Sequence, residues 1–435
     1  MLDFLFTKTP LTFMIQSFWR DEAFTALLAK KDIWKIIYLT AKDFSPPLYY
    51  ILIHFWMNIF GSSEISLRSF SLICFWATIY IIYLFITEIL KIKKNLIILL
   101  CLILVVTNPL LIYYAFEARM YTLLAFLSSL SIYSLLRDKR KLFFISNLLN
   151  FYTHYFSFFV FLLEAIYVFY IKKDKKKIFV KNNYFFLPLF FYMPWIIFLF
   201  LNHSLSTNFW IKKPEFKTIT QVPFYLYTGY EREFNFYDKN IKYFNWFFLL
   251  ILLITILYWK KIKKVKYFNF FFLWGIFLPL VIFVFSYFIK PLFLPRYLIA
   301  FNIGLLLFLT IIFSNLPKKI SLLLMILLIY LNFNYNAVQI KERKKNDLRK
   351  TILEIKTIAS KDDLVYVTDE LDFHVVQYYF DENRVYIYNR EYKEIPKYVG
   401  KILIPETKIK DILPSFPKKA FILYSSGKYE IQSQL

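Results

Sequence analysis

Long apolar runs recur along most of this chain, and short polar connections separate them. A helix needs about 20 mostly apolar residues to cross roughly 30 Å of hydrocarbon. Runs of suitable length predict ten membrane-spanning helices, and a weaker eleventh at 1–19 that Lys8 and Pro10 interrupt. The ten predicted spans are 68–89, 95–115, 119–136, 142–154, 155–171, 184–201, 243–259, 267–289, 296–315 and 320–336.

The last part of the chain has a different pattern. From about 340 onward, short runs of β-type residues alternate with helix-like stretches, which predicts a small soluble α/β domain. The predicted strands are Leu364–Thr368, Arg384–Tyr388 and Ala420–Tyr424. The expected fold is therefore an all-α polytopic membrane domain of about 11 helices over 1–339, followed by a soluble domain over 340–435.

The segment 20–66 also differs from an ordinary connection between spans. Two stretches, Ala23–Lys31 and Ile33–Ala41, carry Trp, Phe and Ile in an amphipathic pattern, which is typical of helices that lie in the membrane interface. The consecutive prolines Pro46 and Pro47 then predict a fixed turn before another aromatic helix. We therefore expect an ordered outer segment rather than a flexible loop.

Composition supports a membrane protein and excludes several classes of function. Of the 435 residues, 59% are hydrophobic and 22% aromatic, which is more apolar surface than a soluble fold of this length can bury. The six glycines are too far apart for G-x-G-x-x-G or G-x-x-x-x-G-K-[ST], so neither nucleotide-binding loop is present. The four histidines are too scattered for a metal-binding pair one helical turn apart. We predict no cofactor and no metal, and any energy for group transfer would arrive with the substrate.

The formal net charge of +24 reflects topology rather than nucleic-acid binding. Nineteen Lys and Arg residues gather in alternate connections, whereas the intervening hinges hold only Arg119, Lys290 and Arg296. Because basic loops of membrane proteins face the cytoplasm, we predict a cytoplasmic N-terminus in the cell membrane. The segment 20–66, the loop 202–242 and the tail are then on the outer side. The basic connections are 91–94, 137–141, 172–177, 260–266 and 318–319.

An acidic pair, Asp21 and Glu22, follows the first apolar segment. Acids are favoured at the start of a helix, so one explanation is a solvated pair that stabilises a helix end. The alternative is a pair of catalytic carboxylates. We favour the alternative because further motifs follow in order, beginning with Asp43, the two prolines and Tyr49.

The outer hinge Tyr113–Tyr121 contains Glu117, Arg119 and Tyr121. Glu117 and Arg119 could simply pair with each other or with a neighbouring helix. However, charged groups at membrane depth are costly, and by default they indicate a functional site. We therefore retain this hinge as a candidate part of an active site.

Other outer-side candidates are Arg296 and Tyr297 at the start of a late span, and His154 and Tyr155 in another hinge. Arg296 could instead extend its side chain to the membrane interface. A histidine in such a hinge is more often a packing residue than a catalyst. Glu164 is alone within a span, and we expect a structural partner and assign it no role.

The motifs described above, taken in their order along the chain, resemble those of the integral-membrane C-type (GT-C) glycosyltransferases. They are most similar to the protein O-mannosyltransferase and aminoarabinose transferase group. The resemblance covers roughly 10–340 and includes the acidic pair, Ser45–Tyr50, the segment Ser63–Phe70, the hinge Tyr113–Tyr121 and Pro295–Leu298. Two features depart from the group. Its first spanning helix is normally long and uninterrupted, and many of its members carry His or Lys where Ser45 stands.

The resemblance implies transfer of a sugar from a polyprenyl-phosphate carrier to an acceptor outside the cytoplasm, with inversion at the anomeric carbon. The carrier would be undecaprenyl phosphate in a bacterium, and the acceptor a lipid, a polysaccharide or a protein. Asp21 would be the base, Glu22 would bind the acceptor or orient Asp21, and Arg119 and Arg296 would bind the phosphate. Some members of the superfamily bind a divalent metal near the acidic pair, but we predict none here.

Two other classes remain open on sequence grounds. A transporter of lipid-linked sugars would carry charged groups near the bilayer midplane and matching halves of the chain. A non-catalytic membrane scaffold would not need Asp21, the two prolines and Arg119 on one side of the membrane. Neither alternative explains the clustering of these residues at the outer interface as well as a glycosyltransferase does.

Overall fold

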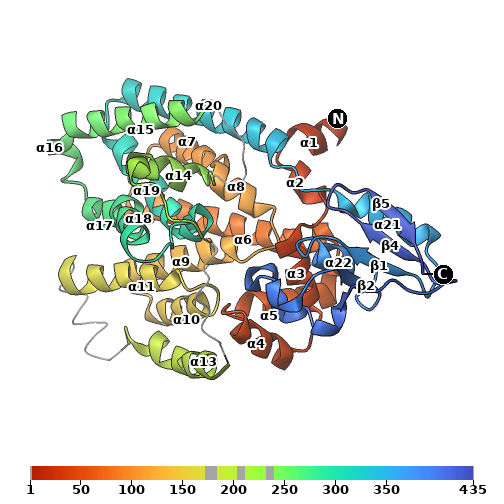
Figure 1. Ribbon diagram of the computed structural model, residues 1–435. Helices are drawn as coiled ribbons and strands as arrows, with labels where there is room; N and C mark the ends of the chain where they lie inside the picture. The colour runs from red at the N-terminus through yellow and green to blue at the C-terminus, as the bar shows by residue number, and fades with distance from the viewer. Residues whose placement is uncertain (1, 172–183, 203–210, 232–239, 435) are drawn as a thin grey trace. The chain divides into compact units, whose positions relative to one another are not determined.

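The computed structural model is mainly helical, with one small sheet near the C-terminus (Figure 1). It describes residues 2–171, 184–202, 211–231 and 240–434. Packing divides the chain into two compact units. The helical unit comprises Met1–Phe13, Ser71–Phe198 and Leu205–Arg343. The mixed unit comprises Met14–Phe70 and Lys344–Leu435, together with a short piece that begins at Leu199.

The helical unit contains most of the apolar runs predicted above. Among the described helices, three cross the division between the units: α2 (Thr12–Ile15), α6 (Glu64–Leu84) and α13 (Leu187–Asn202). The other helices of this unit are α1 (Leu2–Lys8), α7 (Asn95–Val106), α8 (Pro109–Ala115), α9 (Tyr121–Leu136), α10 (Arg140–Phe151), α11 (Ser157–Ile166), α14 (Val222–Thr228), α15 (Asn240–Leu257), α16 (Trp259–Ile262), α17 (Phe268–Phe272), α18 (Leu278–Phe288), α19 (Ile299–Asn315) and α20 (Lys318–Glu342).

Within the described residues, four helices are long and apolar enough to cross a membrane. They are Glu64–Ile89, Phe268–Phe288, Pro295–Asn315 and Lys318–Glu342, and α7 with α8 makes a fifth if that bent pair is one span. Several other predicted runs form shorter apolar helices, so the predicted count of eleven spans is not confirmed. The predicted connection 172–177 and parts of the predicted loop 202–242 lie outside the described residues.

The first predicted span is interrupted, because α1 ends at Lys8 and α2 begins only at Thr12. Pro10 lies between them, and proline lacks the backbone N–H that a continuous helix requires. The expectation of a spanning helix over 1–19 was therefore wrong. The interruption that Lys8 and Pro10 predict is present.

The break between α7 and α8 bends the chain by 57°, and side chains of other helices satisfy the backbone groups that it releases. Asn336 donates to the carbonyl of Thr107 over 2.8 Å, and Gln339 donates to the carbonyl of Pro109 over 3.3 Å. Asn108 caps α8 by accepting from the Leu111 amide over 3.0 Å. Such partners are what allow a helix to break at membrane depth. After the break, α8 leads directly into the hinge Tyr113–Tyr121, whose first residues belong to this helix.

The candidate span that contains α19 is the most buried one, with 89% of its apolar window inside the protein against 50% or less for the others. Two glycines allow α19 to approach the π-helical turn η5 (Leu273–Phe277) closely. A Cβ atom on Gly304 would lie 2.5 Å from the ring of Trp274, and one on Gly275 would lie 2.3 Å from the amide nitrogen of Leu305. Small residues are typical of such close helix contacts in membrane proteins. Arg296 lies in the 3₁₀ turn η6 (Pro295–Leu298), directly before this central helix.

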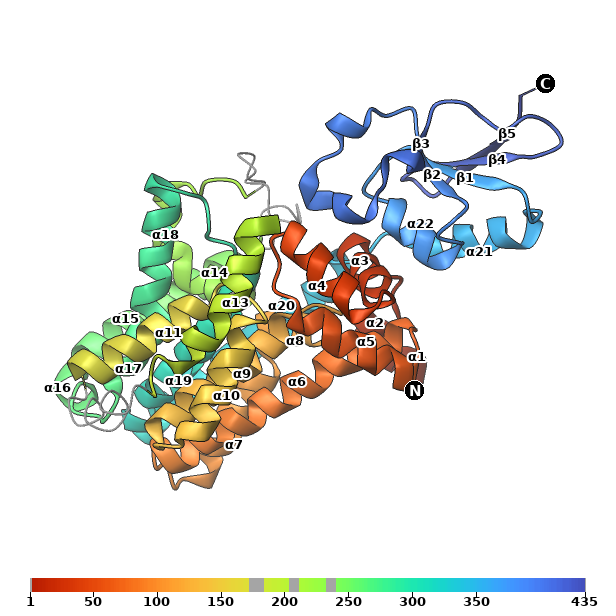
Figure 2. The ribbon, with the colours of Figure 1, turned by 90° about the horizontal axis from the view of Figure 1, so that it is seen from below.

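The mixed unit contains a five-stranded sheet in the order β3-β2-β1-β4-β5. The first four strands in this order pair in parallel and β5 is antiparallel, and Val365 of β1 is opposite both Val385 of β2 and Phe421 of β4. Helices α21 (Leu348–Ile358) and α22 (Phe373–Tyr379) lie on the same face of the sheet (Figure 2). The predicted α/β tail is confirmed. The strands are β1 (Leu364–Val367), β2 (Val385–Tyr388), β3 (Ile409–Lys410), β4 (Ala420–Leu423) and β5 (Tyr429–Gln432).

The outer segment packs with the tail in the mixed unit. It forms α3 (Arg20–Ala29), α4 (Ile33–Lys42) and α5 (Leu48–Phe60), and α3 contacts both α5 and α22. The interface position expected for the first amphipathic stretch stays a prediction, and within the protein α3 is buried from Glu22 to Ala29. Phe24 packs against His374 of α22 with ring centroids 5.6 Å apart. Helix α4 does keep an exposed aromatic side, on which Trp34 is 80% exposed.

Candidate functional site

The two predicted catalytic acids lie side by side in the first turn of α3 but have different surroundings. Asp21 retains 18% side-chain exposure, and its Oδ1 accepts from Nε of Arg20 over 3.0 Å. Glu22 is fully buried. No side chain caps this helix start, and acids in the first turn interact favourably with the helix dipole. Asp21 is therefore the more accessible of the two carboxylates.

Arg68, near the start of α6, explains why Glu22 can be buried. Its side chain donates five hydrogen bonds, the full number that a guanidinium can make. Two go to Glu22, from Nε over 2.8 Å and from Nη2 over 2.7 Å. The other three go to the carbonyls of Met14 over 3.1 Å, Gln16 over 2.5 Å and Ser17 over 3.2 Å. One guanidinium thus fixes both the chain segment before α3 and the acid in the first turn of α3.

A second cation reaches Glu22 from the tail. Nζ of Lys345 lies 2.7 Å from Oε2 of Glu22, and the Lys345 side chain is only 6% exposed. Glu22 therefore lies between two buried cations. Sequence reasoning missed Lys345 altogether and noted Arg68 only as part of the segment Ser63–Phe70. The available signal for Arg68 was a charged residue at the start of a long apolar run.

The predicted turn before α5 is present. Asp43 ends α4, and its Oδ2 accepts from the hydroxyl of Ser45 over 3.1 Å. Pro46 and Pro47 are buried, and α5 begins directly after Pro47. Tyr49 is also buried and packs edge-on against Phe70, with ring centroids 5.9 Å apart. The turn thus fixes Asp43 at the end of α4 within the mixed unit.

The other predicted site residues belong to the helical unit, where Arg296 is paired. Its Nη1 lies 3.2 Å from Oε2 of Glu231, and the two side chains are 10% and 2% exposed. The hydroxyl of Tyr114 donates to Oε1 of the same glutamate over 3.5 Å. Sequence reasoning missed Glu231, because none of the four acids in the loop 202–242 belongs to a recognisable motif. The only signal available was an acid on the same predicted side as Arg296.

His154 lies in the connection between α10 and α11 and is buried among aromatic rings. The ring centroids of His154 and Tyr297 are 4.9 Å apart, and those of Tyr121 and Tyr297 are 6.3 Å apart. Burial, together with the positive charges of Arg119 and Arg296, lowers the pKa of His154 to about 3. Nδ1 of His154 accepts from the Phe156 amide over 3.1 Å, so the proton of the neutral ring is on Nε2. His154 is therefore a neutral hydrogen-bond donor at physiological pH.

Arg119 lies in the bend between α8 and α9. Its Cζ is 6.0 Å from the ring centroid of Tyr121, and Cζ of Arg296 is 6.0 Å from the ring centroid of Tyr297. Glu117 is 2% exposed and Arg119 is half-buried. The structure therefore brings together the predicted hinge, the late-span arginine and His154.

Arg343, at the end of the helical unit, is a third guanidinium near Tyr114 that sequence reasoning missed. Its Nη2 donates to the carbonyl of Gly229 over 2.7 Å, and its Cζ lies 4.4 Å from the ring centroid of Tyr113. The charges of Arg296, Arg343, Glu117 and Glu231 all act on Tyr114. Three arginines and two glutamates thus surround a group of tyrosines and one neutral histidine. We call this set the tyrosine–arginine cluster; its members are Tyr114, Glu117, Arg119, Tyr121, His154, Glu231, Arg296, Tyr297 and Arg343.

The remaining candidates are placed as follows. Tyr155 is half-buried beside His154 in the same connection. Glu164 is fully buried in α11, and neither of its carboxylate oxygens has a hydrogen-bond partner within the described residues. The side chains of Ser131 and Asn147 nevertheless lie close enough to act on this carboxylate, so the structural partner expected for Glu164 stays a prediction.

The donor set around the acidic pair does not favour a metal. In the part of the chain that the structure describes, no three His, Cys, Asp or Glu side chains are grouped closely enough to hold a metal ion. Both carboxylate oxygens of Glu22 already accept from cations. The expectation of no metal stays a prediction.

Comparison with known proteins adds a structural precedent. No family model and no curated protein matches the chain. Among solved structures, the crystal structure of ArnT from Cupriavidus metallidurans in the apo state is 10% identical, with a TM-score of 0.61 over 92% of this chain and 88% of that one. This chain has the ArnT fold. The same protein bound to undecaprenyl phosphate is also 10% identical and gives a TM-score of 0.59 over 97% of this chain and 91% of that one.

The match to ArnT bears on both units, because it extends over more than nine-tenths of the chain. It therefore includes the tail with its sheet as well as the apolar helices. The fold implied by the aminoarabinose transferase resemblance is confirmed, although the count of spanning helices is not.

Proposed function

We propose that this protein is a membrane glycosyltransferase that transfers a sugar from a polyprenyl-phosphate carrier to an acceptor on the outer side of the membrane. The match to ArnT, one structure of which holds undecaprenyl phosphate, carries the proposal. The tyrosine–arginine cluster supports it independently, because arginine is well suited to bind phosphate oxygens. The carrier would be undecaprenyl phosphate in a bacterium, and the acceptor a lipid, a polysaccharide or a protein.

In the proposed reaction, Asp21 takes the proton from the acceptor hydroxyl as the acceptor oxygen attacks the anomeric carbon. The new carbon–oxygen bond forms as the bond to the carrier phosphate breaks, and the configuration inverts. Asp21 suits this role better than Glu22, since it is partly exposed and Glu22 is buried between Arg68 and Lys345. Glu22 would orient Asp21 by fixing the first turn of α3.

The leaving polyprenyl phosphate would be stabilised by the tyrosine–arginine cluster. Arg119 and Arg296 would donate to its oxygens, and the Nε2–H of His154 is a further donor that stays neutral. Glu231 compensates the buried charge of Arg296 before the donor binds. Preorganised donors of this kind each contribute about 10²–10³-fold to rate.

The proposed topology follows the distribution of basic residues. The connections 91–94, 137–141, 260–266 and 318–319 would face the cytoplasm together with the N-terminus. The mixed unit, with Asp21 and the C-terminal sheet, would then lie on the outer side, where lipid-linked sugars meet their acceptors.

Purified full-length protein assayed with a synthetic polyprenyl-phosphate sugar tests the proposal. Asp21→Asn should lower transfer by about 10²–10⁴-fold while thermal stability and binding of the lipid donor are unchanged. Asp362→Asn is a matched control, because it removes an exposed carboxylate from the same unit and should transfer at the wild-type rate. Full activity of Asp21→Asn would exclude Asp21 as the base. Movement of lipid-linked sugar across vesicles without a new glycosidic product would indicate a transporter.

A further inference from the structure

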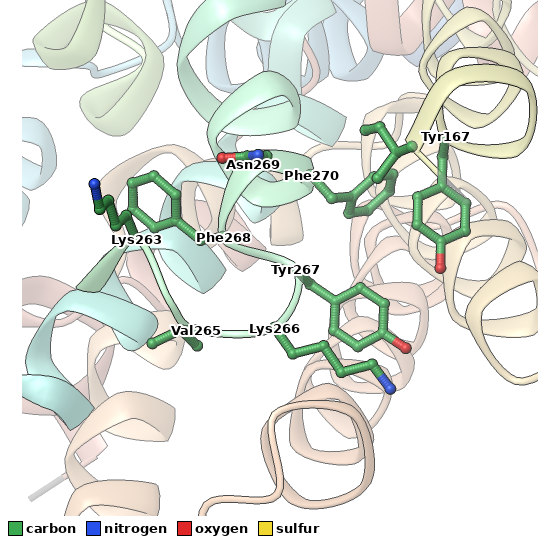
Figure 3. A pocket seen from close by; sticks show the side chains of 9 residues that line it. Tyr167, Lys263, Val265, Lys266, Tyr267, Phe268, Asn269 and Phe270 are labelled. Carbon is green, nitrogen blue, oxygen red and sulfur yellow. The ribbon is translucent and has the colours of Figure 1, made fainter. Parts of the chain in front are cut away.

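A pocket of about 120 Å³ lies in the helical unit, and none of the residues assigned above lines it (Figure 3). It is formed by the connection between α16 and α17 and by the π-helical turn η2 (Tyr167–Ile171) that follows α11. Its lining includes Lys263 and Lys266, the aromatic side chains of Tyr167 and Tyr267, and apolar surface from Ile171 and Phe270. Among the residues that the structure describes, no acidic side chain lines the pocket.

Two hydroxyl groups and one ammonium group lie on the same side of this pocket (Figure 3). The hydroxyl of Tyr167 is buried and makes no hydrogen bond of normal geometry within the described residues, although Tyr267 lies close enough to act on it. The ring of Tyr267 is close to it, with centroids 6.4 Å apart, and Nζ of Lys266 lies 4.9 Å from the Tyr267 centroid. A buried hydroxyl without a partner is costly, so a ligand that accepts a hydrogen bond from Tyr167 would be favoured.

The electrostatic surroundings favour an anion. Lys263 lies on the side of the pocket opposite Lys266, so both sides carry positive charge (Figure 3). The negative charge of Asp138 interacts with Tyr167, but Asp138 does not line the pocket. A more open hollow of about 540 Å³ adjoins the pocket at Val265 and adds further lysines. These are Lys260, Lys261 and Lys264.

The position of the pocket along the chain indicates which kind of anion it would bind. The pocket lies between the ends of apolar helices, in a basic connection that we predict to face the cytoplasm, and its lining combines lysines with apolar side chains. Basic pockets between membrane helices on this side are suited to phospholipid head groups, whose phosphate is attached to apolar chains. A soluble phosphate would use the charges but not the apolar part of the lining.

We propose that this pocket binds the phosphodiester group of an anionic phospholipid. Lys266 and the hydroxyls of Tyr167 and Tyr267 donate to the phosphate oxygens, Lys263 adds charge from the other side, and Ile171 and Phe270 contact the apolar part of the lipid. This site is separate from the tyrosine–arginine cluster and does not depend on the proposed transferase activity.

The test measures lipid binding and thermal stability of the full-length protein, with no activity assay. Mixed micelles that contain phosphatidylglycerol should raise the melting temperature, whereas phosphatidylcholine micelles and inorganic phosphate should not. Lys266→Gln should weaken retention of phosphatidylglycerol in native mass spectrometry by about fivefold, the effect of one basic residue near an anionic lipid. Tyr167→Phe removes only the hydroxyl without a partner, so it should retain the fold in phosphatidylcholine and lose part of the shift that phosphatidylglycerol produces.

Lys318→Gln is the matched control, because it removes one exposed lysine from a basic connection that does not line the pocket. It should retain phosphatidylglycerol as the wild type does. Wild-type retention by both Lys266→Gln and Tyr167→Phe would overturn the proposal. An equal loss in Lys318→Gln would overturn it too, because the attraction would then come from the whole basic surface. Full stabilisation by inorganic phosphate alone would mean that the site binds a soluble anion instead of a lipid.

Discussion

Arg68 donates to both carboxylate oxygens of Glu22, from Nε to Oε1 over 2.8 Å and from Nη2 to Oε2 over 2.7 Å. Both side chains are completely buried, and the guanidinium uses its remaining donors on the carbonyls before α3. The pair therefore connects the beginning of α6 with the first turn of α3, where Asp21 lies. This contact distinguishes the two adjacent acids, which the sequence alone does not. Glu22 is held by buried cations, whereas Asp21 stays partly exposed.

Glu22→Gln should destabilise the protein by about 3–5 kcal/mol, because Arg68 and Lys345 would be left as buried charges without a carboxylate. A thermal unfolding curve of the purified protein measures the loss. Glu382→Gln is the control, since Glu382 pairs with Lys31 at a site where both side chains are about a third exposed. That exposed pair should cost at most about 1 kcal/mol. Equal melting temperatures for the two variants would contradict the assignment.

Arg296→Gln combined with Glu231→Gln should remove a phosphate-binding guanidinium without leaving a buried charge unpaired. We expect stability close to that of the wild type and a KM for the lipid-linked donor that is about 10- to 100-fold higher, the effect of one charge-assisted hydrogen bond. Steady-state kinetics over a range of donor concentrations measure it. Lys290→Gln, which removes an exposed cation, is the control and should leave this KM unchanged. An unchanged KM in the double variant would remove Arg296 from the donor site.

Stability should fall in acid partly because of His374. Burial lowers its pKa to about 4, although its Nε2–H donates to the carbonyl of Gly400 over 3.2 Å. The unfolded chain binds this proton with a pKa near 6.5, so the contribution of His374 is complete above pH 6.5 and is lost as the pH falls toward 4. At pH 5 the loss is about 2 kcal/mol. His374→Gln should flatten the fall in melting temperature between pH 7 and pH 5, and an unchanged slope would exclude this explanation.

Gly304→Ala should destabilise the helical unit, although alanine favours a helix by about 1 kcal/mol over glycine. The new methyl group would lie 2.5 Å from the ring of Trp274, which is itself fully buried. Overpacking of this kind costs about 1–3 kcal/mol. The sign of the change in stability therefore shows whether overpacking or helix propensity is the larger effect. The melting temperature of the variant provides the test, and a more stable protein would mean that η5 and α19 can move apart.

The sequence predicted local features well, where one segment determines its own structure. The strands Leu364–Val367, Val385–Tyr388 and Ala420–Leu423 agree with the predicted runs to within one residue, because alternating β-branched and aromatic residues favour a strand locally. Pro10 interrupts the first helix for an equally local reason. The α/β nature of the tail could therefore be predicted before its sheet order was known.

Features that depend on distant partners could not be predicted. The amphipathic pattern of α3 suggested an interface helix, but α22 covers it from about 350 positions further along the chain. Arg68 and Lys345 are 46 and 323 positions from Glu22, and no motif signals such a pairing. Glu231 and Arg343 were missed for the same reason. The structure places Arg119, His154 and Arg296 near one another, and their roles stay a prediction. The sequence did not indicate the acid that pairs with Arg296 or the third guanidinium.

Because Lys345 contacts Glu22, the C-terminal tail is part of the structure that holds the proposed base. A chain shortened before Lys344 would still contain every long apolar helix and every residue proposed for the chemistry. It would nevertheless lose one of the two cations on Glu22 and the helix that covers Phe24. The sheet and the segment around the proposed base must therefore fold together. The segment around the base is nevertheless synthesised long before synthesis of the sheet begins.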